Sequence, residues 1–221
     1  RLSDYDTSRT SAALVKESHR ITSKDTPEVR SILLSVSHPD FSYREGQNIG
    51  ITVPGAQAFG HEQHFRLYTI ANTPRQTEGG DIEIELCVRR CFYIDEVSGE
   101  EYPGLASNFL CDARPGDRIG FTGPYGDAFR IPEDPATNLL MIGTGTGIAP
   151  FRAFIQHIYE KQPDWQGQVR LFYGARTGTE TLYRNDLNDD LSNYYDRDTF
   201  EAFEGLSQRP WMDREDTGLS E

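Results

Sequence analysis

The chain is short of cysteine, lysine and long apolar runs, and each shortage argues against a class of protein. Its three cysteines, Cys87, Cys91 and Cys111, include no Cys-x-x-Cys pair, whereas a cluster or structural zinc usually has about four Cys or His ligands at tighter spacings. We therefore expect no metal site, and free thiols in a reducing compartment favour a cytoplasmic location. No apolar run approaches the roughly 18 residues of a membrane span, so we expect none.

Positive charge is also scarce. The 22 Lys and Arg residues, of which three are Lys, stand against 35 Asp and Glu, and the formal net charge is −13. This balance disfavours nucleic acids and anionic membranes as partners. The 221 residues suit one large or two modest domains, and we expect a monomer. The chain shows no signal-peptide pattern and starts at Arg1 instead of Met, so we expect a processed or trimmed N-terminus.

What the sequence does contain is a glycine-rich segment between Met141 and Arg152, with the sequence MIGTGTGIAPFR. It follows an apolar run and precedes an amphipathic helical pattern that continues to Tyr159. A strand, a glycine turn and a helix in that order direct unpaired backbone N–H groups and a helix dipole at one point, which suits a phosphate. The usual dinucleotide fingerprint has a third glycine where Ile148 stands, and a Walker A loop would need a lysine. An ordinary strand-to-helix turn is the alternative.

Two regions differ in pattern. Residues from about 13 to 130 predict short strands separated by turns, typical of a barrel or sandwich. Residues 81–89 alternate apolar and polar at period two, as a half-buried strand does. We expect strands over residues 28–37, 48–53, 64–71, 81–91 and 118–122, and a short helix over 104–111 with Ser107 and Asn108 as candidate caps.

The second region follows a proline-rich hinge at Ile131–Pro135. Strands are predicted over residues 138–142, 168–173 and 199–206, alternating with helices over 149–161 and about 180–191. This βαβαβ order implies a parallel sheet. We place the domains at residues 1–133 and 134–221. A nucleotide-binding domain of this kind usually has about five or six strands, so we expect the second domain to be incomplete in this chain.

A second candidate site lies on the expected strand that contains Arg66, Tyr68 and Thr69. Alternation places Arg66 and Tyr68 on one face and Thr69 on the other. Arginine offers a planar fork for a pyrophosphate, and tyrosine offers a flat surface for a ring. This tetrapeptide, Arg-x-Tyr-Thr, becomes informative only together with Gly104–Leu110 and the glycine-rich segment, in this order.

With these motifs on one chain, the sequence resembles the plant-type ferredoxin–NADP(H) reductase family from about Glu28 to Ser207. The resemblance is carried by the glycine-rich segment and by a series of ordered motifs: Phe41-x-Tyr43-x-Glu45-Gly46-Gln47, Arg66–Ala71, Cys87–Arg90, Gly104–Asp112, Gly123-Pro124, Leu171–Gly174 and Leu182-Tyr183. It implies an antiparallel FAD-binding β-barrel followed by a parallel α/β domain that binds NADP(H). The family's C-terminal part, including an aromatic residue over the flavin, is expected beyond Glu221.

The function that the resemblance implies is electron transfer between NADP(H) and a one-electron carrier such as ferredoxin or flavodoxin. Hydride would pass between nicotinamide C4 and flavin N5, with FAD supplying the chemistry. One alternative is the reductase component of an oxygenase system, in which an oxygenase component is the partner. Another is a flavin-binding regulatory module without turnover.

The resemblance also implies roles for single residues. Arg66 would hold the FAD pyrophosphate, Tyr68 would stack on the isoalloxazine, and Thr69 replaces a serine whose hydroxyl bonds flavin N5, so Tyr68 and Thr69 are the expected catalytic residues. The other expected FAD-binding residues are Leu67, Cys87, Val88, Tyr93, Leu105, Ala106 and Ser107. The expected NADP(H)-binding residues are Arg89, Gly145, Thr146, Gly147, Ala175, Arg176, Ser207, Gln208, Arg209 and Arg214. For two of these residues an alternative to cofactor contact remains open: Cys87 could be a small apolar filler, and Arg89 could be a solvated strand residue.

The choice between NADP(H) and NAD(H) rests on the end of the second expected parallel strand. NAD sites usually place an acid there to accept from the ribose 2′-hydroxyl, whereas this strand ends Tyr173-Gly174-Ala175-Arg176. The arginine favours an extra phosphate, so we expect NADP(H). The family's Ser-Arg pair after the third strand is represented here by Ser207-Gln208-Arg209, with the arginine displaced by one position.

Overall fold

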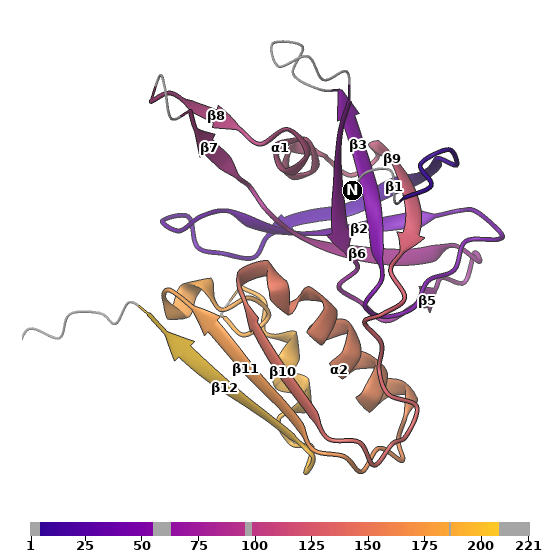
Figure 1. The fold of residues 1–221 in the computed structure, drawn as a ribbon, viewed down its shortest axis with the longest axis vertical. Helices are drawn as coiled ribbons and strands as arrows, with labels where there is room; N and C mark the ends of the chain where they lie inside the picture. The colour runs from indigo at the N-terminus through magenta and orange to yellow at the C-terminus, as the bar shows by residue number, and fades with distance from the viewer. Residues whose placement is uncertain (1–4, 55–62, 96–98, 186, 208–221) are drawn as a thin grey trace, which may run out of the picture.

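The computed structural model describes residues 5–54, 63–95, 99–185 and 187–207. They form an antiparallel β-barrel and, below it in Figure 1, a three-stranded parallel sheet with a helix packed behind it. The expected fold, an antiparallel β domain followed by a parallel nucleotide-binding sheet, is confirmed. Gln208, Arg209 and Arg214, three of the expected nucleotide-binding residues, lie outside the described residues.

Seven strands form the barrel sheet, in the order β4-β3-β9-β1-β2-β6-β5. A bridge between Ile70 and Leu86 joins the end of β4 to β6 and closes the barrel. The strands are β1 (Ser11–Arg20), β2 (Val29–Val36), β3 (Asn48–Pro54), β4 (Gln63–Thr69), β5 (Arg75–Gln76), β6 (Ile82–Arg89) and β9 (Arg118–Tyr125), and β7 (Phe92–Ile94) and β8 (Glu101–Pro103) form a separate hairpin.

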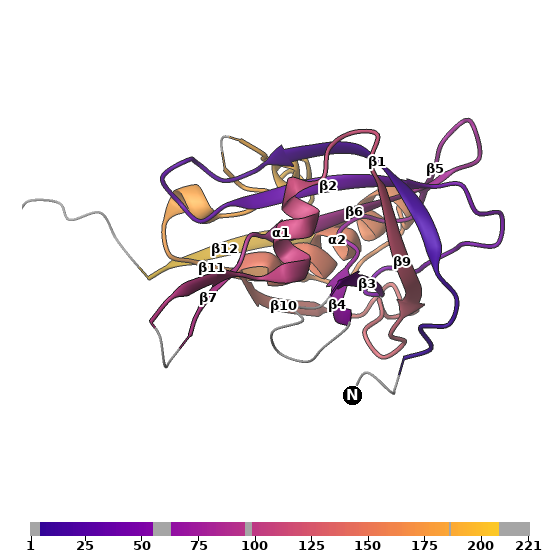
Figure 2. The same cartoon turned by 90° about the horizontal axis from the view of Figure 1, so that it is seen from above.

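One helix, α1 (Leu105–Asp112), covers an open side of the barrel (Figure 2). It was expected at this place, but neither Ser107 nor Asn108 is its N-cap, because that position belongs to Gly104. Ala106 and Leu110 of α1 are buried in the barrel core together with Ile49, Leu86 and Phe121. The helix is therefore fixed to the barrel by its apolar face, and its first turn remains at the barrel surface.

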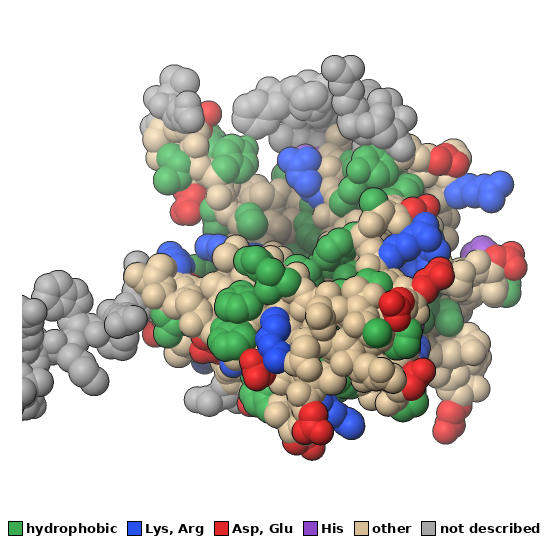
Figure 3. All heavy atoms as spheres, turned by 60° about the horizontal axis from the view of Figure 1, so that its bottom comes forward, with side chains coloured by type: hydrophobic (Ala, Val, Ile, Leu, Met, Phe, Trp, Pro, Cys, Tyr) green, Lys and Arg blue, Asp and Glu red, His purple; other side chains and the backbone are tan. Residues whose placement is uncertain are grey.

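The second domain contains β10 (Leu139–Thr144), β11 (Val169–Ala175) and β12 (Phe200–Leu206), all parallel and in that order. A 3-10 turn at Gly145–Ile148 leads from β10 directly into α2 (Ala149–Lys161), which covers one face of the sheet. The other face exposes the apolar side chains of Leu140, Ile142, Phe172 and Phe203. A few charged side chains lie beside apolar ones on this side of the molecule (Figure 3).

The prediction of a helix at about Glu180–Leu191 is wrong. The segment contains two short 3-10 turns, Gly178–Glu180 and Asp190–Tyr194, and Tyr183 between them has a left-handed φ of 61°. Asn185 donates from its side chain to the carbonyls of Thr181 and Ile21. Because Asn and Asp bond readily to nearby backbone, this Asn- and Asp-rich segment folds into turns. Leu182, Tyr183 and Leu191 are buried, whereas Leu187 is exposed.

Candidate functional site

Strand β4 lies at the end of the sheet order, and among the described strands β3 is its only partner along most of its length. The guanidinium of Arg66 is exposed, and among the residues that the structure describes it bonds only to the neighbouring carbonyl of Phe65, at 3.1 Å. Tyr68 lies against the barrel core, and this burial raises the pKa of its hydroxyl. Arg66 thus keeps most of its donors free for an anion, and Tyr68 offers a ring that is fixed from behind.

Thr69 points to the other side of β4, and its hydroxyl donates to Oδ1 of Asn48 at 2.7 Å. Asn48 is the first residue of β3 and stands opposite Thr69 in the register. Because the hydroxyl proton is already committed to the amide oxygen, the lone pairs of the Thr69 oxygen remain available to accept a bond. The sequence did not identify Asn48 as a site residue, and only its place after the Glu45-Gly46-Gln47 turn could have suggested it.

The first turn of α1 presents backbone N–H groups instead of side chains. Its N-cap, Gly104, provides no side chain to accept from them. The side chains of Ala106 and Ser107 are buried, and the Ser107 hydroxyl accepts from the backbone N–H of Cys91 at 3.2 Å. Of the expected residues here, Leu105 and Ala106 would therefore contact a phosphate through their amides. A helix start without a side-chain cap fits the pyrophosphate of FAD.

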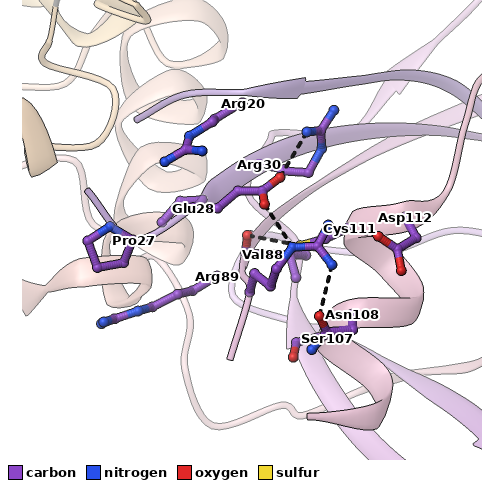
Figure 4. Close-up of polar contacts among 12 residues, drawn as sticks. Arg20, Pro27, Glu28, Arg30, Val88, Arg89, Ser107, Asn108, Cys111 and Asp112 are labelled. Atoms are coloured by element: carbon purple, nitrogen blue, oxygen red, sulfur yellow. Dashed lines mark hydrogen bonds and ion pairs between the residues drawn. The ribbon is translucent and has the colours of Figure 1, made fainter. Parts of the chain in front are cut away.

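Arg89 and Arg90, at the end of β6, make different contacts. Arg90 bonds to Glu28 at 2.7 Å, to Asn108 at 2.8 Å and to Asp112 at 2.8 Å, which fastens α1 to β2 and raises the pKa of its guanidinium. Arg89 points away from this network, on the same side as Arg20 (Figure 4). Arg89 forms no ion pair with any residue that the structure describes, so it remains free to attract an anion.

The other residues expected around the adenosine part of FAD are divided between surface and interior. Tyr93 of β7 is exposed and stacks on Tyr102 of β8, with ring centroids 5.5 Å apart, so the hairpin presents a flat aromatic surface. Val88 is buried in the barrel core, and Cys87 lies in the cluster that joins the two domains. Burial raises the pKa of the Cys87 thiol to about 12, in agreement with an apolar filler.

A cleft of about 460 Å³ opens where the parallel strands end, between the second domain and the barrel. It unites most of the residues expected to bind NADP(H): Arg89, Gly145, Thr146, Ala175, Arg176 and Ser207. Gly145 adopts φ +52° here, which favours glycine, and its carbonyl accepts from the Tyr173 hydroxyl at 3.0 Å. Gly147 is exposed and does not line the cleft. The cleft also contains Glu180, which the sequence did not predict.

A second unpredicted residue, Arg152 of α2, joins the two candidate sites. Its guanidinium donates to the carbonyl of Ala71 at 2.8 Å and to Glu85 at 2.9 Å, both in the barrel, and to Asp190 at 2.7 Å in the second domain. Arg152 is 6 % exposed, and its guanidinium carbon lies 4.5 Å from the ring centroid of Tyr183. The glycine turn before α2 is thereby fixed to the chain two residues after Thr69.

More polar contacts follow Arg152 along α2. Gln156 accepts from the backbone N–H of Thr73 at 3.1 Å, and His157 lies 2.7 Å from the buried carboxylate of Glu45. Burial opposes ionisation of Glu45, but the hydrogen bond from His157 helps to hold its pKa below the usual value. One face of α2 is therefore bonded to the barrel over several turns, which sets the orientation of the glycine turn relative to β4.

Comparison with known proteins assigns a family to each of the two domains. Residues 13–129 match the oxidoreductase FAD-binding domain family, and residues 141–218 match the oxidoreductase NAD-binding domain family. The chain is 39% identical over 171 residues to a ferredoxin–NADP reductase of Thermosynechococcus vestitus and 38% identical over 171 residues to the leaf isozyme 1 of Arabidopsis thaliana, each time over 76% of this chain. The chain belongs to the plant-type ferredoxin–NADP reductase family.

The ferredoxin–NADP reductase fold extends over nearly all of the chain. A solved ferredoxin–NADP+ reductase of Plasmodium falciparum, described as a complex with 2′P-AMP, matches with a TM-score of 0.71 and 19% identity, over 93% of this chain and 76% of that one. The chain spans about half the length of the curated relatives that it matches, 44% and 47% of the two named above. Within the described part of the chain, no helix is long and apolar enough to cross a membrane, and no cluster of His, Cys, Asp or Glu is arranged for a metal ion.

Proposed function

We propose that this chain is the flavin- and nucleotide-binding part of an FAD-dependent oxidoreductase that transfers electrons between NADP(H) and a one-electron carrier such as ferredoxin or flavodoxin. One observation carries the proposal. Arg152 bonds to Ala71, next to the end of β4, and belongs to the helix that follows the glycine turn directly. The side chains expected to hold the flavin and the loop expected to hold the nicotinamide therefore belong to one fixed interface.

The residues of the chain divide the work of binding and orientation. Arg66 and the amides of the α1 start hold the FAD pyrophosphate, while Tyr68 supports the ring. Thr69, whose hydroxyl donates to Asn48, would accept a hydrogen bond from N5–H of the reduced flavin and so favour the product of hydride transfer. FAD, when bound, supplies hydride exchange with the nicotinamide and single-electron release to the carrier. Arg89 attracts the phosphates of the nucleotide into the cleft, and Arg176 lines the same cleft directly after β11.

The proposal of NADP(H) over NAD(H) is supported by Arg176, which lies at the end of β11 and lines the cleft. The proposal of ferredoxin as carrier rests on the relatives, which are named ferredoxin–NADP reductases and are up to 39% identical. Both are carried over from whole relatives, of whose length this chain spans about half.

Anaerobic titration tests the activity. NADPH added to the full-length protein loaded with FAD is expected to bleach the flavin absorbance, and oxidised ferredoxin added afterwards is expected to restore it. Absence of bleaching by both NADPH and NADH would overturn the proposal and favour a binding module without turnover. If neither ferredoxin nor flavodoxin reverses the bleaching, the proposal that one of them is the carrier fails. An oxygenase component is then the remaining partner.

Thr69→Val tests the assigned hydrogen bond. Valine keeps the shape of threonine but removes the hydroxyl, so flavin reduction by NADPH is expected to slow about tenfold, the effect of about 1.4 kcal/mol in the transition state, while FAD remains bound. Thr69→Ser is the matched control and should reduce at nearly the parent rate, because it retains the hydroxyl. Equal stopped-flow rates for the valine variant and the parent would contradict the role of Thr69.

A further inference from the structure

The nucleotide cleft contains an ion pair at the end of β11 that the sequence did not predict. Arg176, directly after β11, donates from Nη2 to Oε1 of Glu180 at 2.7 Å and from Nε to Oε2 at 3.3 Å. Glu180 ends the 3-10 turn Gly178–Glu180, and its side chain is 14% exposed. Both residues line the cleft together with Gly174, Gly205 and Ser207. The carboxylate thus occupies the Nε–Nη2 edge of the guanidinium in the nucleotide site.

The two members of this pair have opposite preferences for a nucleotide. In parallel nucleotide-binding sheets, an acid near the end of the second strand accepts from a ribose 2′-hydroxyl, whereas an arginine there accommodates a 2′-phosphate. This chain places one of each at the end of β11 and bonds them to each other. Arg176 directly follows β11, whereas Glu180 belongs to the 3-10 turn Gly178–Glu180, where the sequence predicted the start of a helix.

We propose that Glu180 is a specificity-determining residue that weakens the preference of this cleft for 2′-phosphorylated nucleotides. The inference rests on the proposed nucleotide-binding function. A 2′-phosphate either displaces Glu180 from the Nε–Nη2 edge of Arg176 or binds the other N–H groups of the guanidinium. In both cases a second anion lies beside the Glu180 carboxylate, and the repulsion weakens binding. A ribose with a free 2′-hydroxyl donates to a lone pair of Glu180 and leaves the pair intact. The cleft therefore accepts NAD(H)-type ligands beside NADP(H).

The remaining charge in the cleft supports this assignment. Of the described residues that line the cleft, Arg89, Arg176 and Glu180 are the charged ones, and Arg176 and Glu180 neutralise each other. Arg89 comes from the barrel and makes no ion pair with a described residue, so it attracts phosphate groups of either nucleotide. Discrimination between the nucleotides is thus left to the Arg176–Glu180 pair.

Glu180→Gln tests the inference, because glutamine retains size and an acceptor oxygen but loses the charge. The probes are 2′-phospho-AMP and 5′-AMP, with dissociation constants measured by calorimetry on the FAD-loaded full-length protein. We expect 2′-phospho-AMP to bind about tenfold more tightly, because a like charge next to the phosphate is removed. Binding of 5′-AMP is expected to stay the same or weaken. Glu201→Gln is the matched control, since it removes an equal charge from an exposed pair with Arg170, at the other end of the sheet.

The ratio of the two dissociation constants decides the outcome. An unchanged ratio in Glu180→Gln, or the same change in Glu201→Gln, would overturn the inference. Arg176→Gln provides a second variant if the first does not fold, and it is expected to abolish discrimination between the probes; retained discrimination would also overturn the inference. If neither probe binds any variant or the parent, the nucleotide site and the inference both fail. If the ratio shifts as expected but NADPH does not bleach the flavin, the proposed activity fails and the inference stands.

Discussion

Arg152 allows the sharpest test of how the two domains are joined. Replacing it by methionine retains much of the apolar stem but removes every donor that Ala71, Glu85 and Asp190 receive from it. Removing one partner of a buried ion pair usually costs about 3–5 kcal/mol, because a charge remains buried without compensation. The free energy of unfolding of a native protein is about 5–15 kcal/mol in total, so the loss is a large fraction of its stability.

The measurement is thermal and urea-induced unfolding of Arg152→Met beside the parent. At about 2–4 °C per kcal/mol, the midpoint is expected to fall by about 6–20 °C. Arg75→Met is the matched control, since Arg75 pairs with Glu160 at 3.2 Å across the same interface but is half exposed. An exposed pair contributes about 0–1 kcal/mol, so this variant should unfold close to the parent. Equal midpoints for the two variants would refute the assignment of Arg152 as the central contact.

The pH dependence gives a second check on Arg152. Burial already raises the pKa of Asp190, while Arg152 opposes the rise. Without Arg152 this pKa rises further, so the unpaired carboxylate destabilises the fold above its folded pKa, and the penalty disappears as the pH falls below the unfolded value of about 3.9. The deficit of Arg152→Met is therefore expected to shrink at acid pH. A deficit that stays constant with pH would indicate lost packing and not an unpaired charge.

Three further predictions concern the packing and titration of other residues. The pKa of Glu45 is depressed in the fold, so its carboxylate stabilises the fold above the unfolded pKa of about 4.3, and this stabilisation is lost as the pH falls through the folded pKa. The free energy of unfolding of Glu45→Gln should therefore fall less with acid than that of the parent, measured by urea unfolding between about pH 3 and pH 6. Gly167→Ala should cost about 1–3 kcal/mol of unfolding free energy or more, because a Cβ would lie 1.9 Å from a backbone oxygen, whereas Gly178→Ala meets nothing within 4 Å and should unfold at the parent midpoint. A thiol reagent should label only exposed Cys91 in the native protein and should fail to label native Cys91→Ser, since burial raises the thiol pKa to about 12 for each of the other two, Cys87 and Cys111.

Local sequence pattern was sufficient for most of the fold. Period-two alternation predicted β6, and the helix over residues 149–161 has the bounds that the sequence indicated. Strand β1 was missed because Ala13 and Val15, its buried residues, are small or isolated among polar neighbours. The apolar spacing of Leu182 and Leu191 suggested a helix, but that spacing reflects burial alone and did not reveal the left-handed turn at Tyr183.

The candidate site could be predicted only where one short segment carries it. The glycine turn and Arg176 were identified because their chemistry is visible within a few residues, and the structure places them in one cleft. Arg152 was not identified, since its role depends on partners that chain topology brings near. Glu180 follows Arg176 by only four residues, but the sequence assigned it to a helix and did not indicate that both side chains line the cleft. A guanidinium that bonds to residues 81 and 67 positions earlier in the chain has no signature in its own neighbourhood.

The Arg152 cluster also limits how this protein could be rebuilt from parts. A chimera that joins this barrel to the nucleotide-binding domain of a relative inherits Glu85 and the Ala71 carbonyl, but it receives the guanidinium only if the donor domain supplies one at the equivalent helix position. The reciprocal chimera leaves Arg152 with Asp190 and the Tyr183 ring, without its two barrel acceptors. Exchange between relatives is therefore expected to succeed only when the barrel residue and the helix residue are inherited together.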